Sequence, residues 1–111
     1  GQTGVTVDAE KTDAGTPAAL LQDAGTGSSA EAVVTSFRGV DGMRSFGGAT
    51  AGYTSANLPR ALYDGASIVL TQSVYVDRDG TTYPEVGIEP DEATDDAEAA
   101  ALAWMQSQGC R

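Results

Sequence analysis

One stretch of nine residues decides how this chain is organised: Gly25-Thr26-Gly27-Ser28-Ser29-Ala30-Glu31-Ala32-Val33. It joins a short apolar strand, predicted over residues 17–22, to an apolar-periodic helix predicted over residues 29–38. Small residues form the corner, and the hydroxyl of Ser28 stands where the helix begins. The first N–H groups of a helix lack partners inside it and carry the positive end of its dipole. Ser28 is therefore a candidate nucleophile, because those N–H groups could stabilise an oxyanion that forms beside it.

The same residues also allow a purely structural interpretation. Ser28-x-x-Glu31 is a capping box, in which the serine accepts from the third helical N–H and the glutamate reaches back to the serine N–H. Capping boxes are far commoner than active sites, so the nine residues alone leave both interpretations open.

Composition excludes several classes of partner. The chain has 111 residues, which is enough for one domain, and its net charge is −10. That charge argues against nucleic acid or an anionic membrane surface as a partner. No apolar run approaches 18 residues, so we expect no membrane-spanning helix. The start Gly1-Gln2-Thr3 lacks a methionine and is typical of a processed or truncated end, so targeting information could have been removed.

The residues that usually activate a serine are nearly absent. The chain has no histidine, and its one lysine is Lys11. A serine nucleophile needs a base to take its proton, and the usual base is missing. Cys110 is the only cysteine, so it cannot form a disulfide within this chain.

The remaining pattern predicts an α/β fold. Residues 1–16 indicate an edge strand or a flexible arm. After the first helix the pattern predicts a turn at Asp41-Gly42, a strand at 44–46 and a glycine-rich loop at 47–53. Two hairpins follow: strands at 58–63 and 66–76 joined by a turn at Asp64-Gly65, and then a second turn at 77–80 with a return at 81–83. An acidic loop at 85–96 comes last before the terminal helix. One connecting helix and one terminal helix can cover little more than one face of such a sheet, so the fold looks incomplete.

The terminal helix is predicted from Ala97 to about residue 108. Asp95-x-x-Glu98 is a capping box for its start, and Gly109 ends it. Its apolar stripe is predicted to hold Ala101, Leu102 and Met105, with Trp104 beside the stripe and packed on the sheet.

No metal or cofactor site is predicted. Asp77-x-Asp79-Gly80 resembles the start of a calcium loop, but the further ligands of that loop are missing, so we favour a plain turn. Seven carboxylates lie within residues 85–98, and we interpret them as a solvated loop that runs into a helix N-terminus. The glycine-rich loop matches neither phosphate-binding pattern, which argues against a nucleotide.

Four motifs together resemble the tail-specific, or C-terminal processing, serine peptidases. Thr26 to Glu31 resembles their nucleophile motif. The three later motifs follow in the family's order: Phe46-Gly47-Gly48-Ala49-Thr50-Ala51-Gly52, Leu62 to Thr71, and Asp79-Gly80-x-x-Tyr83 with Gly87-Ile88-Glu89-Pro90-Asp91. The resemblance covers residues 17–92 and implies the C-terminal half of a crotonase-like, Clp-protease-like catalytic core. It implies that Ser28 is the catalytic serine and that the N–H of Ser29 belongs to the oxyanion hole.

One departure from the family pattern is informative. The serine–lysine members carry a lysine directly after the glycine of the loop, and this chain has Tyr53 there, after Gly52. The variant is more similar to the branch that contains the nisin-resistance proteins, in which the resemblance implies a histidine base from the N-terminal half. Gly52 and Tyr53 are then expected to line the substrate site. We therefore expect residues 1–111 to be the C-terminal portion of a larger peptidase domain, with an arm or edge strand at 1–16, a motif-bearing core at 17–92 and a terminal helix at 93–109.

The expected function is that of a secreted or extracytoplasmic bacterial serine endopeptidase that cleaves near the C-terminus of peptide or unfolded protein substrates. The N-terminal half of the same peptidase is its expected partner and would carry any membrane anchor. No cofactor is expected, and this chain alone is expected to be inactive. Two other interpretations stay open: a non-catalytic module that binds peptides or other ligands with a peptidase-like fold, and a structural domain in which Ser28 only caps a helix.

Overall fold

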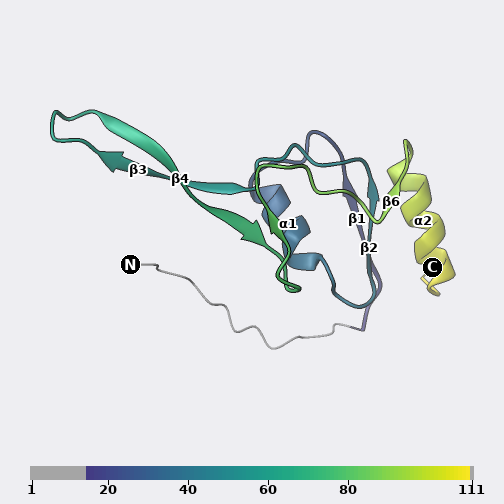
Figure 1. Ribbon diagram of the computed structural model, residues 1–111. Coiled ribbons are helices and arrows are strands. Elements are labelled where there is room, and N and C mark those ends of the chain that lie inside the picture. The colour runs from purple at the N-terminus through teal and green to yellow at the C-terminus, as the bar shows by residue number, and fades with distance from the viewer. Residues whose placement is uncertain (1–14, 111) are drawn as a thin grey trace.

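The computed structural model describes residues 15–110 and shows a mixed α/β fold (Figure 1). Its elements, in chain order, are β1 (Ala18–Gln22), α1 (Ser29–Phe37), β2 (Met43–Gly47), β3 (Ser55–Ala61), β4 (Ser67–Val76), β5 (Thr82–Tyr83), β6 (Glu92–Ala93) and α2 (Ala97–Ser107). The arm or edge strand predicted at residues 1–16 falls almost entirely outside the described residues and stays a prediction.

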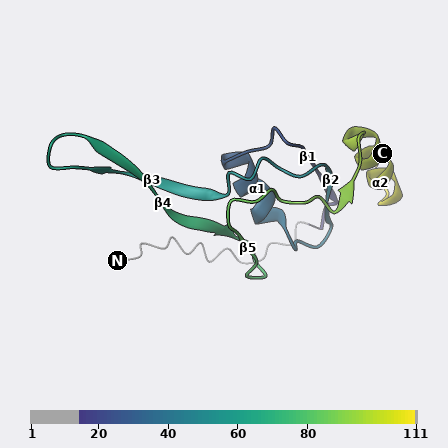
Figure 2. The same ribbon diagram turned by 45° about the horizontal axis from the view of Figure 1, so that its top comes forward.

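A small parallel sheet forms the centre of the molecule. Its strand order is β1-β2-β6, and all neighbours run parallel. The two helices lie on opposite sides of it, as Figures 1 and 2 both show. On the α1 side, Val34 and Ile88 are buried in a cluster against which Leu20 packs. On the α2 side, the rings of Phe46 and Trp104 meet with their centroids 5.9 Å apart. The two helices thus cover the two faces of this sheet, whereas the sequence predicted cover for little more than one.

The close contact between β1 and β2 requires a glycine at the end of β2. Gly47 has φ +125°, and a Cβ added there would lie 1.9 Å from the carbonyl oxygen of Gln22. The next residue, Gly48, donates its N–H to that same oxygen at 3.0 Å. This contact fixes where the loop after β2 begins.

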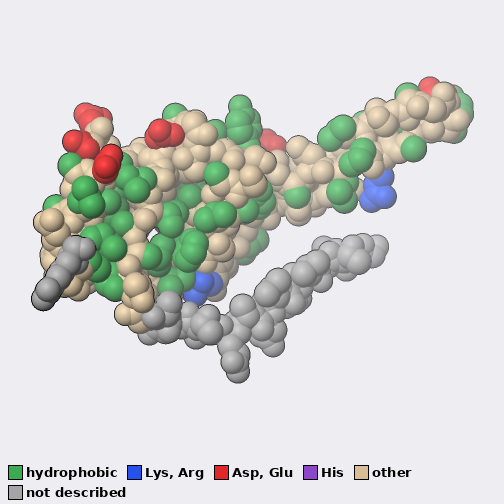
Figure 3. Space-filling model, turned by 180° about the vertical axis from the view of Figure 1, so that it is seen from behind, with side chains coloured by type: hydrophobic (Ala, Val, Ile, Leu, Met, Phe, Trp, Pro, Cys, Tyr) green, Lys and Arg blue, Asp and Glu red, His purple; other side chains and the backbone are tan. Residues whose placement is uncertain are grey.

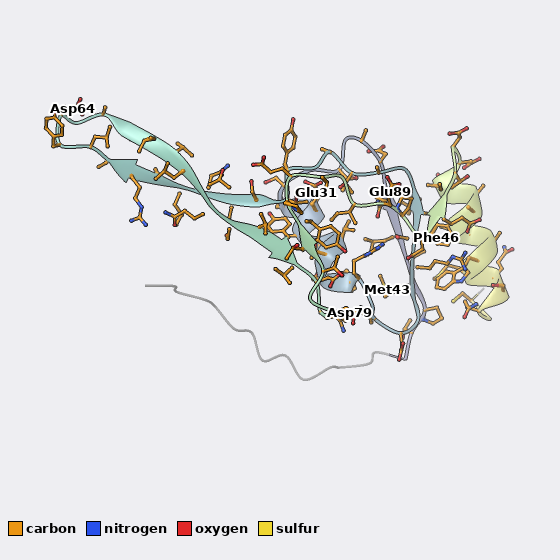
Figure 4. The ribbon with its side chains drawn as sticks, in the orientation of Figure 1. Glu31, Met43, Phe46, Asp64, Asp79 and Glu89 are labelled. Carbon is orange, nitrogen blue, oxygen red and sulfur yellow. The ribbon has the colours of Figure 1, made fainter. Side chains whose placement is uncertain are left out.

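Strands β3 and β4 form a long antiparallel hairpin that projects from the body, with Asp64 at its tip (Figures 1 and 4). From here on, the arm means this hairpin, residues 55–76, and not the arm or edge strand predicted at residues 1–16. Every residue from 56 to 73 is exposed. Leu58 pairs with Leu70, so both lie on one face, whereas the pair Pro59 and Val69 lies on the other. Hydrophobic side chains are visible along the arm in Figure 3. The arm is therefore a ribbon with apolar side chains on both faces.

The arm begins earlier than predicted. The sequence placed its first strand at residues 58–63, but β3 spans Ser55–Ala61. Ser55 pairs with Val74 across a bulge between Ala56 and Asn57, although residues 55–57 lack apolar alternation. The strand ends at Ala61 because the hairpin loop already closes there, with the Leu62 N–H bonded to the Ala66 carbonyl at 2.7 Å.

The second hairpin turn is confirmed as a plain turn. The Asp77 carboxylate accepts the N–H groups of Asp79 and Thr81 at 3.0 and 2.9 Å, and Gly80 has φ +84°. Tyr83 donates its hydroxyl to the same carboxylate at 2.8 Å. Desolvation raises the pKa of Asp77, but these hydrogen bonds outweigh it and lower that pKa below its ordinary value. The carboxylate is therefore occupied by its own turn.

Two details of the terminal helix differ from the prediction. The capping residue is Asp96, whose carboxylate accepts the Ala99 N–H at 3.0 Å, and the predicted cap at Asp95 is wrong. Leu102 is 57% exposed, so it does not belong to the buried stripe that holds Ala101. The helix turns Trp104 toward Phe46 instead, and this rotates Leu102 to solvent.

One strand was missed inside the acidic segment. Glu92–Ala93 forms β6, which pairs with Phe46 and Gly47 of β2. The strand is two residues long and has no apolar alternation, so its pattern is that of a loop. The adjoining Asp91 fixes it: Asp91 Oδ2 accepts the N–H of Ser45 at 2.8 Å and the hydroxyl of Ser45 at 3.0 Å.

Candidate active site

Ser28 has a backbone conformation that an ordinary helix cap does not need. It stands at the start of α1 with φ +52° and ψ −115°, and it is exposed. An ordinary N-cap residue has β-region angles. A non-glycine residue with positive φ costs about 1–3 kcal/mol and persists only where its surroundings hold it. The corner therefore holds the exposed Ser28 in this conformation at a cost in free energy.

The N–H of Ser29 is available for an oxyanion. Ser29 is the first residue of α1, where backbone N–H groups lack partners within the helix. No hydrogen bond from this N–H is found within residues 15–110. The next N–H, of Ala30, is bonded to the Gly27 carbonyl at 3.1 Å. One free donor beside Ser28 thus lies at the positive end of the helix.

Glu31 links the serine corner to the glycine-rich loop. Its side chain is fully buried. Oε2 accepts the N–H of Ser28 at 2.8 Å, while Oε1 accepts the Thr50 hydroxyl at 2.5 Å and the Gly52 N–H at 2.7 Å. Desolvation raises the pKa of Glu31, but the hydrogen bonds from Thr50, Gly52, Ser28 and Tyr53 together lower it below the ordinary value of 4.5. The carboxylate is therefore held in its ionised form.

The connection continues from Thr50 into the Gly87-Ile88 motif. The Thr50 hydroxyl accepts the N–H of Ile88 at 2.8 Å. Gln22, at the end of β1, donates its amide to the carbonyls of Ile88 and Gly48 at 2.7 and 3.0 Å. The structure thus brings together three of the four motifs through buried polar contacts. The remaining motif, residues 62–71, lies in the projecting arm, away from the corner. Beyond that motif, Tyr75 of β4 donates its hydroxyl to the carbonyl oxygen of Ser28 at 3.3 Å.

The two residues predicted to bind substrate occupy different environments. Tyr53 is 68% exposed, and its ring lies beside the corner, because a Cβ added at Gly27 would be 3.1 Å from Tyr53 Cδ2. Gly52 is buried, and its N–H is taken by Glu31. Tyr53 is thus placed where a ligand near Ser28 would touch it, whereas Gly52 is placed to hold the loop.

Residues 15–110 offer no histidine or lysine that could act as a base for Ser28. The chain contains no histidine, and Lys11 lies outside the described residues. The carboxylate that accepts the N–H of Ser28, Glu31, is occupied by backbone and hydroxyl donors. A pocket of about 560 Å³ lies at the opposite end of α1, around Phe37, Arg38 and Met43, and Ser28 does not line it. The candidate nucleophile is therefore exposed and lies outside this pocket.

The described residues contain neither a metal-binding cluster nor a membrane-spanning helix. Among residues 15 to 110, no three His, Cys, Asp or Glu side chains are grouped so that they could hold a metal ion. In the same part of the chain, neither helix has the length and the apolar character that crossing a membrane requires.

Sequence reasoning missed the contacts of four members of this arrangement. Tyr75 and Gln22 sit in apolar strands, where nothing in the alternation marks them as polar anchors. Glu31 was recognised only as a capping residue, and its contact with a loop about 20 residues away has no local signal. Thr50 did offer a signal for its contact, because a buried hydroxyl in a glycine-rich loop needs a hydrogen-bond partner.

Comparison with known proteins relates this chain to a family of peptidases. The family model for peptidase family S41 matches residues 2–94. A nisin-resistance protein of Lactococcus lactis subsp. lactis is 39% identical over 92 residues, which are 83% of this chain and 29% of that protein. Among solved structures, a lipoprotein from Streptococcus agalactiae is 40% identical with a TM-score of 0.74, over 83% of this chain and 32% of its own.

A more distant structure shows the fold alone. The photosystem II D1 C-terminal processing protease has a TM-score of 0.63 at 24% identity, over 71% of this chain and 20% of its own. The chain thus spans less than a third of the length of each of these relatives. The family match covers most of the chain and includes all four motifs that predicted it. The chain belongs to peptidase family S41.

Proposed function

We propose that this chain is the part of a serine peptidase that carries the nucleophile, and that Ser28 is that nucleophile. The observation that carries the proposal is the exposed Ser28 at φ +52°, at the start of a helix whose first N–H, on Ser29, has no partner within residues 15–110. A simple capping role would not explain the left-handed backbone, because an ordinary N-cap residue has β-region angles.

The proposed reaction is acyl transfer. A histidine supplied by the remainder of the protein takes the proton of Ser28 Oγ, which attacks the carbonyl carbon of a peptide bond. The N–H of Ser29 donates a hydrogen bond to the carbonyl oxygen and stabilises the negative charge that develops on it. The histidine then gives its proton to the leaving amine, and water hydrolyses the ester on Ser28. Tyr53 and the loop that Gly52 anchors form one side of the substrate site.

We also propose that the remainder of the protein forms the other side of the substrate site, opposite Ser28 and Tyr53. The matched relatives are more than three times the length of the matched region. The arm exposes apolar side chains such as Leu58 and Val69 on both faces, which is unfavourable for a surface left in water. An N-terminal part that covers the arm and carries the base accounts for both features. Residues 1–111 would then be the C-terminal portion of one catalytic domain.

The substrate class proposed is a flexible peptide, cut near its C-terminus. The chain's net charge of −10 favours cationic peptides through long-range attraction. The name of the nisin-resistance relative makes nisin the first peptide to test. The presence of that protein and of a lipoprotein among the relatives supports an extracytoplasmic location.

An activity-based label tests the proposal. We expect a fluorophosphonate to label the full-length protein, and peptide mapping by mass spectrometry to place the label on Ser28. Residues 1–111 alone should remain unlabelled, because they contain no histidine to act as the base. A full-length protein that binds peptides but resists the label would favour the non-catalytic binding module, and a label on another serine would refute the assignment of Ser28.

A further inference from the structure

The carboxylate of Glu31 has no part in the proposed chemistry, yet it is fully buried directly behind the corner. Burying a carboxylate is costly unless hydrogen bonds replace the water it loses. The groups that face Glu31 are the Thr50 hydroxyl and the backbone N–H groups of Ser28, Gly52 and Tyr53, all of them neutral. The salt bridges of the described residues, Arg38 with Asp91 and Arg44 with Glu92, do not involve it. The structure thus keeps an ionised group in place with dipoles alone.

The two oxygens of this carboxylate serve two separate segments. Oε2 accepts from Ser28, on the corner that precedes α1. Oε1 accepts from Thr50 and Gly52, in the loop that precedes Tyr53. The corner and the loop are also joined by the N–H of Ala51, which donates to the Thr26 carbonyl at 2.8 Å. Glu31 therefore sets the spacing between the segment that carries Ser28 and the segment that carries the exposed Tyr53.

We propose that Glu31 is a positioning residue of the peptidase: its ionised carboxylate holds Ser28 in the left-handed conformation and fixes Ser28 relative to the Tyr53 loop. The kinetic part of this proposal rests on the proposed function, while the structural part does not. The left-handed conformation needs a holding contact, and the hydrogen bond from the Ser28 N–H to Oε2 supplies it. Charge-assisted hydrogen bonds are the strong ones, which suits a carboxylate for this task.

An amide of the same shape cannot replace this carboxylate. Four donors converge on its two oxygens: the hydroxyl of Thr50 and the N–H groups of Ser28, Gly52 and Tyr53. A glutamine offers one acceptor oxygen, and its NH₂ group is itself a donor. In Glu31→Gln either the Ser28 contact or the loop contacts must therefore break, although the volume of the side chain is unchanged.

Backbone amide signals test the structural part without any need for activity. In the full-length protein, we expect the amide protons of Ser28 and Gly52 to shift together on acidification, with one midpoint below pH 4.5, as Glu31 takes up a proton. In Glu31→Gln this shared transition should vanish. A Ser28 amide that neither titrates in the wild type nor moves in Glu31→Gln would overturn the proposal.

Kinetics of the full-length enzyme test the functional part. We expect Glu31→Gln to lower kcat/KM by about 100-fold, mainly through kcat, because a small misplacement of the nucleophile has an effect of that order. Ser45→Ala is the matched control, since it removes two partly buried hydrogen bonds with Asp91 away from the corner. The control should lose stability but keep kcat/KM within about threefold of the wild type.

The two failures can be told apart. If the wild type neither cleaves peptides nor takes the label, the proposed function fails, and the amide titration still decides whether Glu31 holds Ser28. If the wild type is active and Glu31→Gln and Ser45→Ala lose the same small factor in kcat/KM at equal loss of stability, then Glu31 is only a structural residue and the positioning role is refuted.

Discussion

The ring of Tyr53 lies against Gly27, the residue that precedes Ser28: a Cβ added at Gly27 would be 3.1 Å from Tyr53 Cδ2. Tyr53 reaches this place because its loop is anchored by Gly52, whose N–H is bonded to Glu31. The tyrosine is thus a neighbour of the candidate nucleophile and 68% exposed at the same time. It occupies the position at which the lysine branch of the family carries its base, so its role can be separated from that of a base by experiment.

Tyr53→Phe should lower kcat/KM of the full-length enzyme by less than about tenfold, because the ring contact with Gly27 remains and only a hydroxyl is lost. Loss of a general base would lower it by at least about 100-fold. The measurement is steady-state cleavage of a peptide substrate as a function of pH. With a histidine base, kcat/KM should rise with an apparent pKa near about 6.5. A profile that still climbs above about pH 9, together with a 100-fold loss, would assign the base to Tyr53.

Two adjacent glycines should respond very differently to alanine. Gly47→Ala places a Cβ 1.9 Å from the Gln22 carbonyl at a residue with φ +125°, so β1 and β2 must separate locally. We expect a loss of more than about 3 kcal/mol in the free energy of unfolding, or failure to fold. Gly48→Ala is the control, because a Cβ there meets nothing within 4 Å. Urea unfolding of both variants checks this, and equal effects would contradict the described contact between the strands.

The terminal helix should be held mainly through its tryptophan. Trp104→Ala removes the ring that packs on Phe46 and should cost about 3 kcal/mol or more in the free energy of unfolding. Leu102→Ser should change that free energy by less than about 0.5 kcal/mol, because Leu102 is 57% exposed. Chemical denaturation followed by circular dichroism measures both. A large loss for Leu102→Ser would mean that the helix face predicted from the sequence is the buried one in solution.

Acid should remove the stabilisation that the Asp77 turn provides. The pKa of this carboxyl is lower in the folded protein than its ordinary value of 3.8, so the folded state binds fewer protons than the unfolded state near that pH. The contribution is therefore present above about pH 4 and is lost as pH falls through the folded-state pKa. In Asp77→Asn the stability should be lower at neutral pH and should depend less on pH below 4. Urea unfolding between about pH 2.5 and 5 tests this, and an unchanged slope would contradict it.

Local signals predicted most of the secondary structure. The corner at Gly25–Val33, the turn at Asp41-Gly42 and both hairpin turns carry strong short-range signals, and the structure confirms them. Strand β6 and the cap at Asp96 were missed because each depends on a contact outside its own segment. Leu102 was misplaced because several small alanines in α2 leave the direction of its buried face nearly undetermined, and Phe46 decides it.

The candidate site was predicted as a list of residues and not as an arrangement. The sequence marked Ser28, Ser29, Gly52 and Tyr53 through family resemblance, and their catalytic and binding roles stay predictions. The contacts that bring these residues together, above all those of Glu31, join segments about 20 residues apart and have no periodic pattern. The exposure of the arm could not be predicted either, since its apolar strands have the pattern of a buried sheet.

Cleavage of a flexible peptide by full-length Ser28→Ala is the most direct test of the central claim, that Ser28 is the nucleophile of a serine peptidase. Loss of the serine hydroxyl should change the free energy of unfolding by only about 1 kcal/mol. We expect the wild type to cleave the peptide. We expect the variant to fold and to melt close to the wild type, but to show at least a 10⁴-fold lower kcat, of the order found when a catalytic serine is removed. Cleavage by Ser28→Ala at the wild-type rate, in a protein of unchanged fold, would contradict it.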